Sequence, residues 1–142
     1  MAQSRITIIG TGLIGTSVGL SLASRKDRTY EIIGIDRDRN FARTAKKMGA
    51  IDREVGSLEE GLMGAAIVFL TVPVMAARRL LQDMGPYLAE GAIVTDTCST
   101  KSDLMRWAAE YLPEGVHFIG GHPMAGREKS GPSAARADLF QG

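Results

Sequence analysis

The sequence predicts an α/β protein with a doubly wound, mainly parallel sheet of about six strands. Short apolar runs rich in β-branched residues alternate along the 142 residues with longer segments of helical pattern, which is the β-α-β alternation of a parallel sheet. A glycine pattern, Gly10-Thr11-Gly12-Leu13-Ile14-Gly15, follows the first run and opens the first helical segment, as in Rossmann-type domains. A chain of this length fits one domain, so we expect a single Rossmann-type domain over residues 1–142.

The first half of the chain contains the strand and helix on which the glycine pattern depends. Residues 5–10 are apolar and rich in isoleucine, as in a buried strand, and residues 13–25 have a helical pattern. In chain order we then expect a second strand, a second helix closed by Gly49, a short strand and one helical turn, at residues 31–36, 38–48, 51–55 and 58–62.

The second half repeats this alternation. We expect strands at residues 66–71, 92–96 and 117–120, the first two as near-continuous apolar runs covered on both faces. We expect helices at residues 74–88, 101–112 and 132–140, the first disturbed by Gly85-Pro86 and the second capped by Ser99 or Thr100. Four large side chains in these helical patterns are interpreted as core packing: Met75, Met84, Met105 and Trp107.

Composition and charge exclude several classes of function. Lys plus Arg number 17 and Asp plus Glu 16, a net charge of +1, which offers no electrostatic attraction for nucleic acid or an anionic membrane. The apolar run at residues 6–23 holds too many glycines and hydroxyl residues for a membrane span. A single cysteine, Cys98, rules out an intrachain disulfide and suits the reducing cytoplasm, and two histidines with one cysteine at unrelated spacings predict no metal site. We therefore expect a cytoplasmic protein whose partner is a small molecule bound in a pocket.

The glycine pattern predicts a dinucleotide site. Gly10 permits the tight turn after the strand, Gly12 lets backbone N–H groups approach a pyrophosphate, and Gly15 lets the helix pack closely on the strand. The helix N-terminus adds partial positive charge. Asp36 ends the second strand, 21 residues after Gly15, where an acid accepts hydrogen bonds from ribose hydroxyls and repels the 2′-phosphate of NADP.

The cofactor preference depends on the residues that follow the second strand. Asp36 favours NAD, which is the expected cofactor, whereas Arg37 could hold the 2′-phosphate of NADP. Asp36 could instead cap the helix that follows it. The carboxyl edge of an open α/β sheet binds the ligand, so the residues expected to line the cofactor groove beside the glycines are Thr11, Leu13, Ile14, Thr71, Val72 and Pro73.

A loop with a histidine follows the last of the expected strands. It has the sequence GGHPMAGREKSG at residues 120–131, with His122 just past the carboxyl end of the strand and so at the edge where the cofactor is expected. An imidazole with an ordinary pKa of about 6.5 can accept a proton from a substrate hydroxyl while hydride leaves the adjacent carbon. Ser99 lies at the same edge, where it either faces the nicotinamide or caps the next helix. A histidine beside a dinucleotide predicts a dehydrogenase.

The sequence closely resembles the prephenate and arogenate dehydrogenases of tyrosine biosynthesis. The resemblance rests on GTGLIG at residues 10–15, TDTCSTK at residues 95–101 and, above all, GGHPMAGREKSG at residues 120–131. It implies an NAD-dependent oxidative decarboxylation of prephenate to 4-hydroxyphenylpyruvate, with arogenate as the alternative substrate. By the same resemblance His122 accepts the proton of the 4-hydroxyl, Ser99 positions that hydroxyl and the histidine, and Glu128 is an acid at the pocket that tunes or gates access.

The resemblance also implies parts that follow this domain in the family. Such enzymes continue with another strand that completes the nucleotide domain, and with a helical domain that forms a homodimer and supplies basic residues for the substrate carboxylates; residues 1–142 contain neither. Burying the prephenate dianion without paired cations is costly, so we expect this chain to bind NAD but to turn over prephenate poorly or not at all. Two other classes stay open: a non-catalytic NAD-sensing module, and a hydroxyacid or imine dehydrogenase with its chemistry on another loop.

Overall fold

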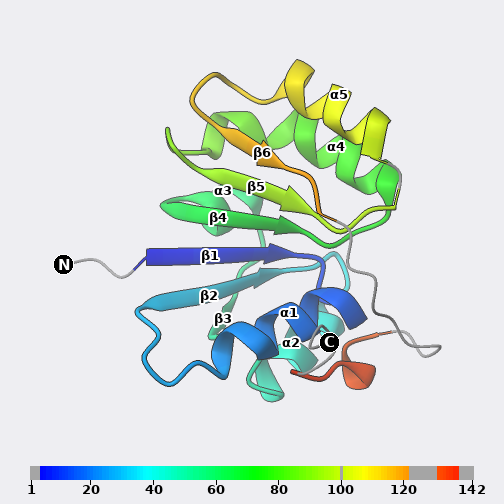
Figure 1. Cartoon of the computed structure of the whole chain (residues 1–142). Helices are drawn as coiled ribbons and strands as arrows, with labels where there is room; N and C mark the ends of the chain where they lie inside the picture. Colours follow the sequence, from blue (N-terminus) through cyan, green and yellow to red (C-terminus); the bar gives the residue numbers. More distant parts are fainter. Residues whose placement is uncertain (1–3, 100, 122–130, 138–142) are drawn as a thin grey trace.

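The computed structural model describes residues 4–99, 101–121 and 131–137 and shows a six-stranded sheet in which every pairing is parallel (Figure 1). The strands are β1 (Ser4–Ile9), β2 (Tyr30–Ile35), β3 (Arg53–Glu54), β4 (Ala65–Leu70), β5 (Ile93–Asp96) and β6 (His117–Ile119). Their order in the sheet is β3-β2-β1-β4-β5-β6. The chain winds outward from β1, returns to the middle at β4 and winds outward the other way. This order confirms the doubly wound parallel sheet.

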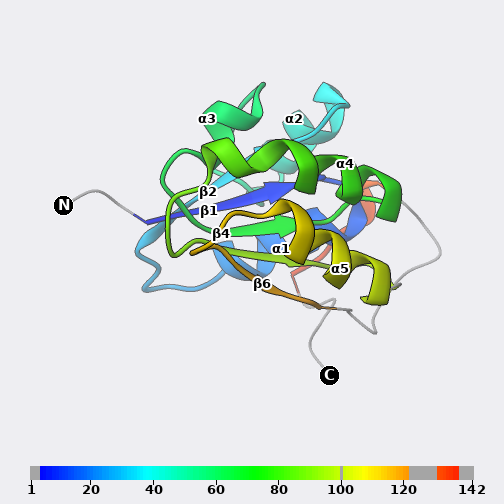
Figure 2. The same ribbon diagram turned by 90° about the horizontal axis from the view of Figure 1, so that it is seen from above.

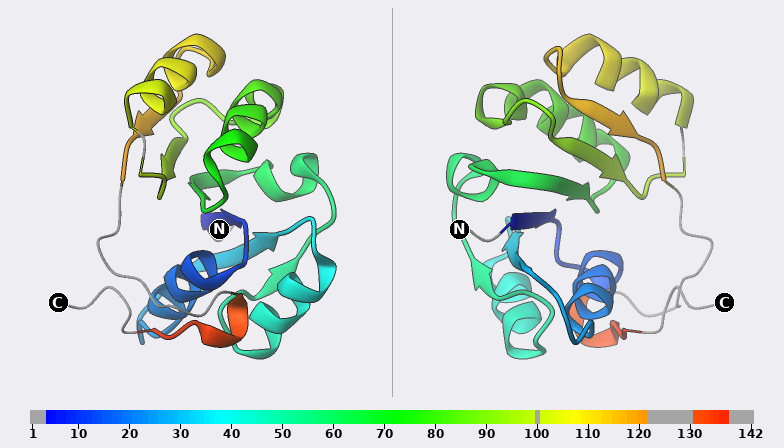
Figure 3. Two further views of the ribbon diagram at one scale, coloured as in Figure 1. Left: turned by 90° about the vertical axis from the view of Figure 1, so that its right-hand side faces the viewer. Right: turned by 60° about the vertical axis from the view of Figure 1, so that its left-hand side comes forward.

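Helices cover both faces of this sheet. They are α1 (Leu13–Ala23), α2 (Arg39–Lys47), α3 (Leu58–Leu62), α4 (Val74–Met84) and α5 (Lys101–Tyr111), with the 3₁₀ turns η1 (Gly85–Tyr87) and η2 (Pro132–Ala134). Figure 3 shows α1 and α2 well apart from α4 and α5, and Figure 2 shows α4 and α5 side by side, where they contact each other. None of the helices in the described ranges is long and apolar enough to cross a membrane.

Two apolar clusters form the core, one on each face. Ile8 of β1 packs with Ile32 of β2 and with residues of α1 and α2. Its neighbour Ile9 packs with Leu70 of β4 and with residues of α3, α4 and α5. Adjacent residues of a strand point to opposite faces, so β1 anchors both layers. The sheet is therefore buried on both sides, as the near-continuous apolar runs predicted.

The helices begin in two different ways. The Asp38 side chain accepts a hydrogen bond from the Asn40 N–H and caps α2, and Ser57 caps α3 through the Glu60 N–H. Gly12, at the start of α1, supplies no side-chain cap. No side-chain oxygen of the cap residue therefore occupies the positive end of the α1 dipole, and an anionic ligand can bind there.

Most expected elements lie within two or three residues of their observed bounds, but the last helix is wrong. Residues 132–140 were expected to be helical, whereas the described part of this range, residues 132–137, has the turn η2 and then extended backbone at Ala135. Residues 138–140 lie outside the described residues. The Arg136 N–H donates to the Ser17 hydroxyl of α1 instead of to a helical carbonyl. The expected helix at 74–88 ends at Met84 and continues as η1, which agrees with the disturbance expected at Gly85-Pro86, because Pro86 has no N–H for a helical bond.

The prediction that the large side chains of the helices pack in the core is confirmed for Met84 and Trp107 only. Met84 is fully buried and Trp107 is nearly so, with the Arg78 guanidinium stacked 5.1 Å from the centroid of the Trp107 ring. Met75 and Met105 are 61% and 45% exposed and do not belong to the core. The helical pattern fixes their spacing but not which face of α4 or α5 meets the sheet.

Candidate functional site

The glycine loop between β1 and α1 lies at the carboxyl edge of the sheet, between β2 and β4. Gly10 has a φ of +99°, and a Cβ there would overlap the Thr71 carbonyl oxygen. A Cβ on Gly15 would overlap the Gly10 carbonyl oxygen. Around Gly12 a Cβ would meet nothing within 4 Å. Two glycines therefore allow the loop to fold tightly against its neighbours, and the third leaves open space at the start of α1.

Threonine hydroxyls hold this loop in place. The Thr71 hydroxyl donates to the carbonyl oxygens of Gly10 at 2.5 Å and Ile9 at 2.9 Å. The Thr16 hydroxyl, fully buried in α1, donates to the Thr11 carbonyl oxygen at 2.9 Å. That Thr71 lines the cofactor groove stays a prediction, and its hydroxyl also fastens the loop to the end of β4. Thr16 was not singled out from the sequence, where nothing distinguishes it from a threonine with its side chain in the core.

Asp36 joins the end of β2 to the same loop. Its Oδ2 accepts hydrogen bonds from the Thr11 N–H at 2.6 Å and the Thr11 hydroxyl at 3.1 Å, and its Oδ1 accepts from the Asp38 N–H at 2.8 Å. The cap of α2 is Asp38, not Asp36, so the alternative that Asp36 caps this helix is wrong. Three donor groups fix the carboxylate beside the glycine loop, and Arg37 follows it as an exposed side chain.

The other predicted groove residues surround this loop. Leu13 and Ile14 form the first turn of α1 and are half-buried. The side chain of Val72 approaches Gly10, where a Cβ would lie 2.7 Å from its Cγ1. Pro73 is exposed and forms the N-cap position of α4. All of these residues follow β1 or β4, on either side of the switch in strand order, where doubly wound sheets bind their ligands.

The candidate catalytic residues are only partly described. Ser99 is exposed in the turn from β5 to α5, at the carboxyl edge. Gly121, directly before His122, lies at the same edge after β6. His122 and Glu128 lie outside the described residues, as does Thr100, so the choice between Ser99 and Thr100 as cap of α5 stays a prediction. The other histidine, His117, starts β6 at the opposite edge and is exposed.

Asp96 is a residue of this edge whose importance was missed. It ends β5, is 1% exposed, and accepts hydrogen bonds from the Cys98 N–H, the Lys101 ammonium and the Gly121 N–H. Burial, with the nearby Asp96 charge, raises the pKa of the Cys98 thiol above its ordinary value. Within the described ranges, no three His, Cys, Asp or Glu side chains are grouped as metal ligands. The sequence signal for Asp96 was an acid ending an apolar strand, followed five residues later by a lysine.

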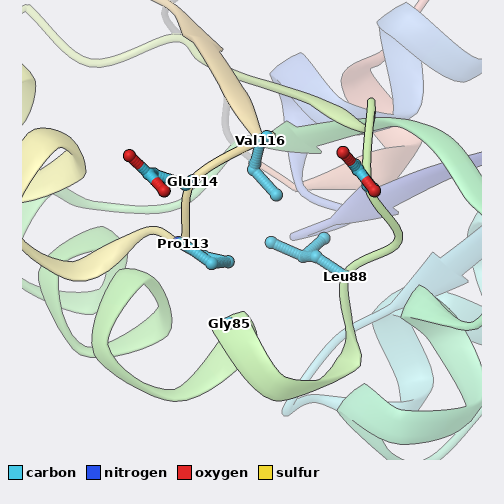
Figure 4. Close-up of a pocket in the computed structure, with 7 residues that line it drawn as sticks. Gly85, Leu88, Pro113, Glu114 and Val116 are labelled. Carbon is cyan, nitrogen blue, oxygen red and sulfur yellow. The ribbon is translucent and has the colours of Figure 1, made fainter.

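A hollow of about 700 Å³ lies at the other end of the sheet (Figure 4). Leu88, Pro113 and Val116 form its apolar part, and Glu90 and Glu114 bring two carboxylates to it. These residues precede β5 and β6, so the hollow faces the amino edge, away from the glycine loop. Two carboxylates would also repel a pyrophosphate. This hollow is not the dinucleotide site.

Comparisons with known proteins agree with this geometry. The family described as "Prephenate dehydrogenase, nucleotide-binding domain" matches residues 18–142. A prephenate dehydrogenase of Lactococcus lactis is 40% identical over 141 residues, which are 98% of this chain and 39% of that protein. The chain thus spans about two fifths of the length of that relative.

Two solved structures share the fold over nearly the whole chain. The prephenate dehydrogenase of A. aeolicus, in complex with hydroxyphenyl propionate and NAD+, has a TM-score of 0.88 and 30% identity, over 100% of this chain and 49% of that one. The Synechocystis arogenate dehydrogenase has a TM-score of 0.85 and 32% identity, over 96% of this chain and 46% of that one.

Proposed function

Because the chain belongs to the family of prephenate dehydrogenase nucleotide-binding domains, we propose that it is the cofactor-binding part of an NAD-dependent enzyme that oxidatively decarboxylates prephenate in tyrosine biosynthesis. The observation that carries this proposal is the loop at Gly12, open to an anion and fixed beside the Asp36 carboxylate. Similar proteins include dehydrogenases of prephenate and of arogenate, so arogenate is the alternative substrate.

The cofactor proposal assigns a part of the dinucleotide to each group at the loop. The open space at Gly12 and the uncapped start of α1 suit the pyrophosphate. The carboxylate oxygens of Asp36 can accept further hydrogen bonds besides those from the protein, and here they accept them from the adenosine ribose hydroxyls. A carboxylate at this position also repels a 2′-phosphate. NAD is therefore preferred over NADP, although the exposed Arg37, directly after Asp36, would favour a 2′-phosphate.

The chemistry of the proposal lies at the ends of β5 and β6. When bound, the nicotinamide ring supplies an acceptor for the hydride on C4 of prephenate. His122 accepts the proton of the 4-hydroxyl, which lets the ring carboxylate leave as carbon dioxide and the ring become aromatic. Ser99 orients that hydroxyl and the imidazole, and Glu128 tunes access to the pocket. These three roles follow from the family resemblance and from the common edge of Ser99 and Gly121.

The whole protein is proposed to be a cytoplasmic homodimer whose further residues hold the substrate carboxylates. On this proposal the 142-residue chain binds the cofactor but turns over prephenate poorly or not at all, because the dianion needs paired cations. Robust turnover by the chain alone would contradict that part of the proposal.

The test starts with calorimetric titration of the chain with NAD and with NADP. We expect tighter binding of NAD, and a loss of that preference in Asp36→Ser but not in the control Asp27→Ser, which removes an exposed carboxylate before β2. Failure to bind either dinucleotide would refute the cofactor assignment. Prephenate and arogenate are then offered separately to the whole protein with NAD, and turnover of neither would refute the proposed reaction.

A further inference from the structure

We propose that Asp96 is the positioning residue of the catalytic centre, with one buried carboxylate that holds both the Ser99 turn and the start of the His122 loop. This inference rests on the proposed function, which assigns Ser99 and His122 to the chemistry. Asp96 acts through the backbone beside these two residues, because it bonds to the N–H groups of Cys98 and Gly121.

The two oxygens of Asp96 bond to different segments. Oδ2 accepts from the Cys98 N–H at 2.8 Å and from the Lys101 ammonium, and both of these groups belong to the connection from β5 to α5. Oδ1 accepts from the Gly121 N–H at 3.1 Å, beyond the end of β6. Ser99 directly follows Cys98, and His122 directly follows Gly121. A single side chain therefore sets the spacing between the two segments.

Burial makes this arrangement rigid and costly to break. Of the Asp, Glu, Lys, Arg and His side chains in the described part of the chain, only that of Asp96 is buried. A buried carboxylate is tolerated when a cation and hydrogen-bond donors surround it. Lys101 supplies the cation with its side chain still 30% exposed, and two N–H groups supply the donors.

The packing at the end of β6 shows why the Asp96 side chain is needed to hold the chain that follows this strand. β6 has three residues and, in the described part of the chain, pairs with β5, and its last register pair joins Thr95 to Ile119. The bond from Gly121 to Asp96 continues the attachment past that pair. A Cβ on Gly121 would lie 2.8 Å from the Asp96 carbonyl oxygen, so the chain passes against the end of β5 at a distance open only to glycine.

Asparagine cannot replace this carboxylate. An amide has one acceptor oxygen and presents N–H donors where the second oxygen was, so it loses either the Gly121 bond or both Oδ2 bonds. A displacement of a catalytic group by about 1 Å can lower turnover by about 100-fold. We therefore expect Asp96→Asn to lower kcat by about 10- to 100-fold, with the KM for NAD changed by less than about 3-fold.

The chain offers a matched control at the opposite edge of the sheet. Asp52 also pairs with a cation, Arg28, at 2.8 Å and accepts a backbone N–H, that of Ile32, at 2.8 Å. Asp52→Asn should therefore lower stability while kcat of the whole protein stays unchanged. If Asp96→Asn reduces kcat no more than Asp52→Asn does, or raises only the KM for NAD, Asp96 is structural and the inference is wrong.

Amide hydrogen exchange tests the same inference without any catalysis. In the unaltered chain the Gly121 and Cys98 amides should exchange at least about 10-fold more slowly than in an unstructured peptide; exchange at the unstructured rate would overturn the inference even if no variant folds. Asp96→Asn should speed exchange at these two amides and not at Ile32, and Asp52→Asn should do the reverse. The two proposals can fail separately. If the amides lose protection as predicted but the whole protein oxidises neither prephenate nor arogenate, the Asp96 contacts are supported and only the proposed reaction is refuted.

Discussion

Replacement of Thr71 by valine tests how the dinucleotide loop is held, because valine keeps the shape of threonine and removes its hydroxyl. That hydroxyl bonds to the carbonyl oxygens of Gly10 and Ile9 at 2.5 and 2.9 Å. A buried carbonyl that loses its donor costs about 1–3 kcal/mol. For a domain of this size the melting temperature should then fall by roughly 3 to 9 °C.

The same change should weaken NAD binding, since the bound loop must be held by fewer contacts. A loss of about 1 kcal/mol of preorganisation corresponds to a roughly 5-fold rise in Kd. Thermal unfolding followed by circular dichroism and calorimetric titration with NAD measure the two effects. Thr29→Val, at an exposed position before β2, is the matched control. A Thr71→Val protein with the melting temperature and NAD affinity of that control would show that the hydroxyl does not fasten the loop.

Four further predictions concern the chemistry and the charges. His122→Asn in the whole protein should lower kcat by about 10²- to 10⁴-fold with NAD affinity little changed; normal turnover in steady-state assays would exclude His122 as the base. Asp36→Ser should raise the ratio of NADP to NAD affinity and, because it also removes the bonds to Thr11, lower the melting temperature; an unchanged ratio would separate Asp36 from the ribose. A hydrogen bond from Arg28 lowers the pKa of Asp52 below its ordinary value, so the stability that Asp52 adds over Asp52→Asn should be complete above about pH 5 and fall as the pH drops through the folded pKa; a difference constant down to pH 2 to 3, about the lowest reach of urea titrations, would contradict this. The raised pKa of the buried Cys98 thiol should make its alkylation by iodoacetamide at pH 8 at least about 10-fold slower than that of free cysteine, and labelling at the free rate would show an open thiol.

Local pattern was sufficient to predict the elements and their order. The β-branched runs, the glycine pattern and the acid after the second run are all contiguous in sequence, so they predict the strands, the loop and the place of Asp36. The failures arise where tertiary contacts decide. The residues after Pro132 were expected to continue as a helix, but the described backbone leaves the turn η2 at Ala135, where it is extended, and the Arg136 N–H donates to the Ser17 hydroxyl.

The candidate site, like the fold, could be predicted from local sequence but not from contacts between distant residues. The spacing of Gly15 and Asp36 indicated that they meet at one edge, yet it could not show that Asp36 bonds to Thr11, because the two residues are 25 positions apart. The role of Asp96 was hidden for the same reason, since its partner Gly121 is also 25 residues away, just past the end of the neighbouring strand. Sequence periodicity predicts the strand to which a residue belongs, but only the pairing of β5 with β6 brings Asp96 and Gly121 together.

The return of the chain to α1 has a consequence for the order of folding. The bond between the Arg136 N–H and the Ser17 hydroxyl closes a loop of 119 residues, and η2 contacts both α1 and α2. Closing so long a loop costs chain entropy that local contacts do not. The segment at residues 131–137 should therefore dock after the sheet has formed and open before it unfolds. Cleavage within it would then report a local opening equilibrium, separate from the global stability of the domain.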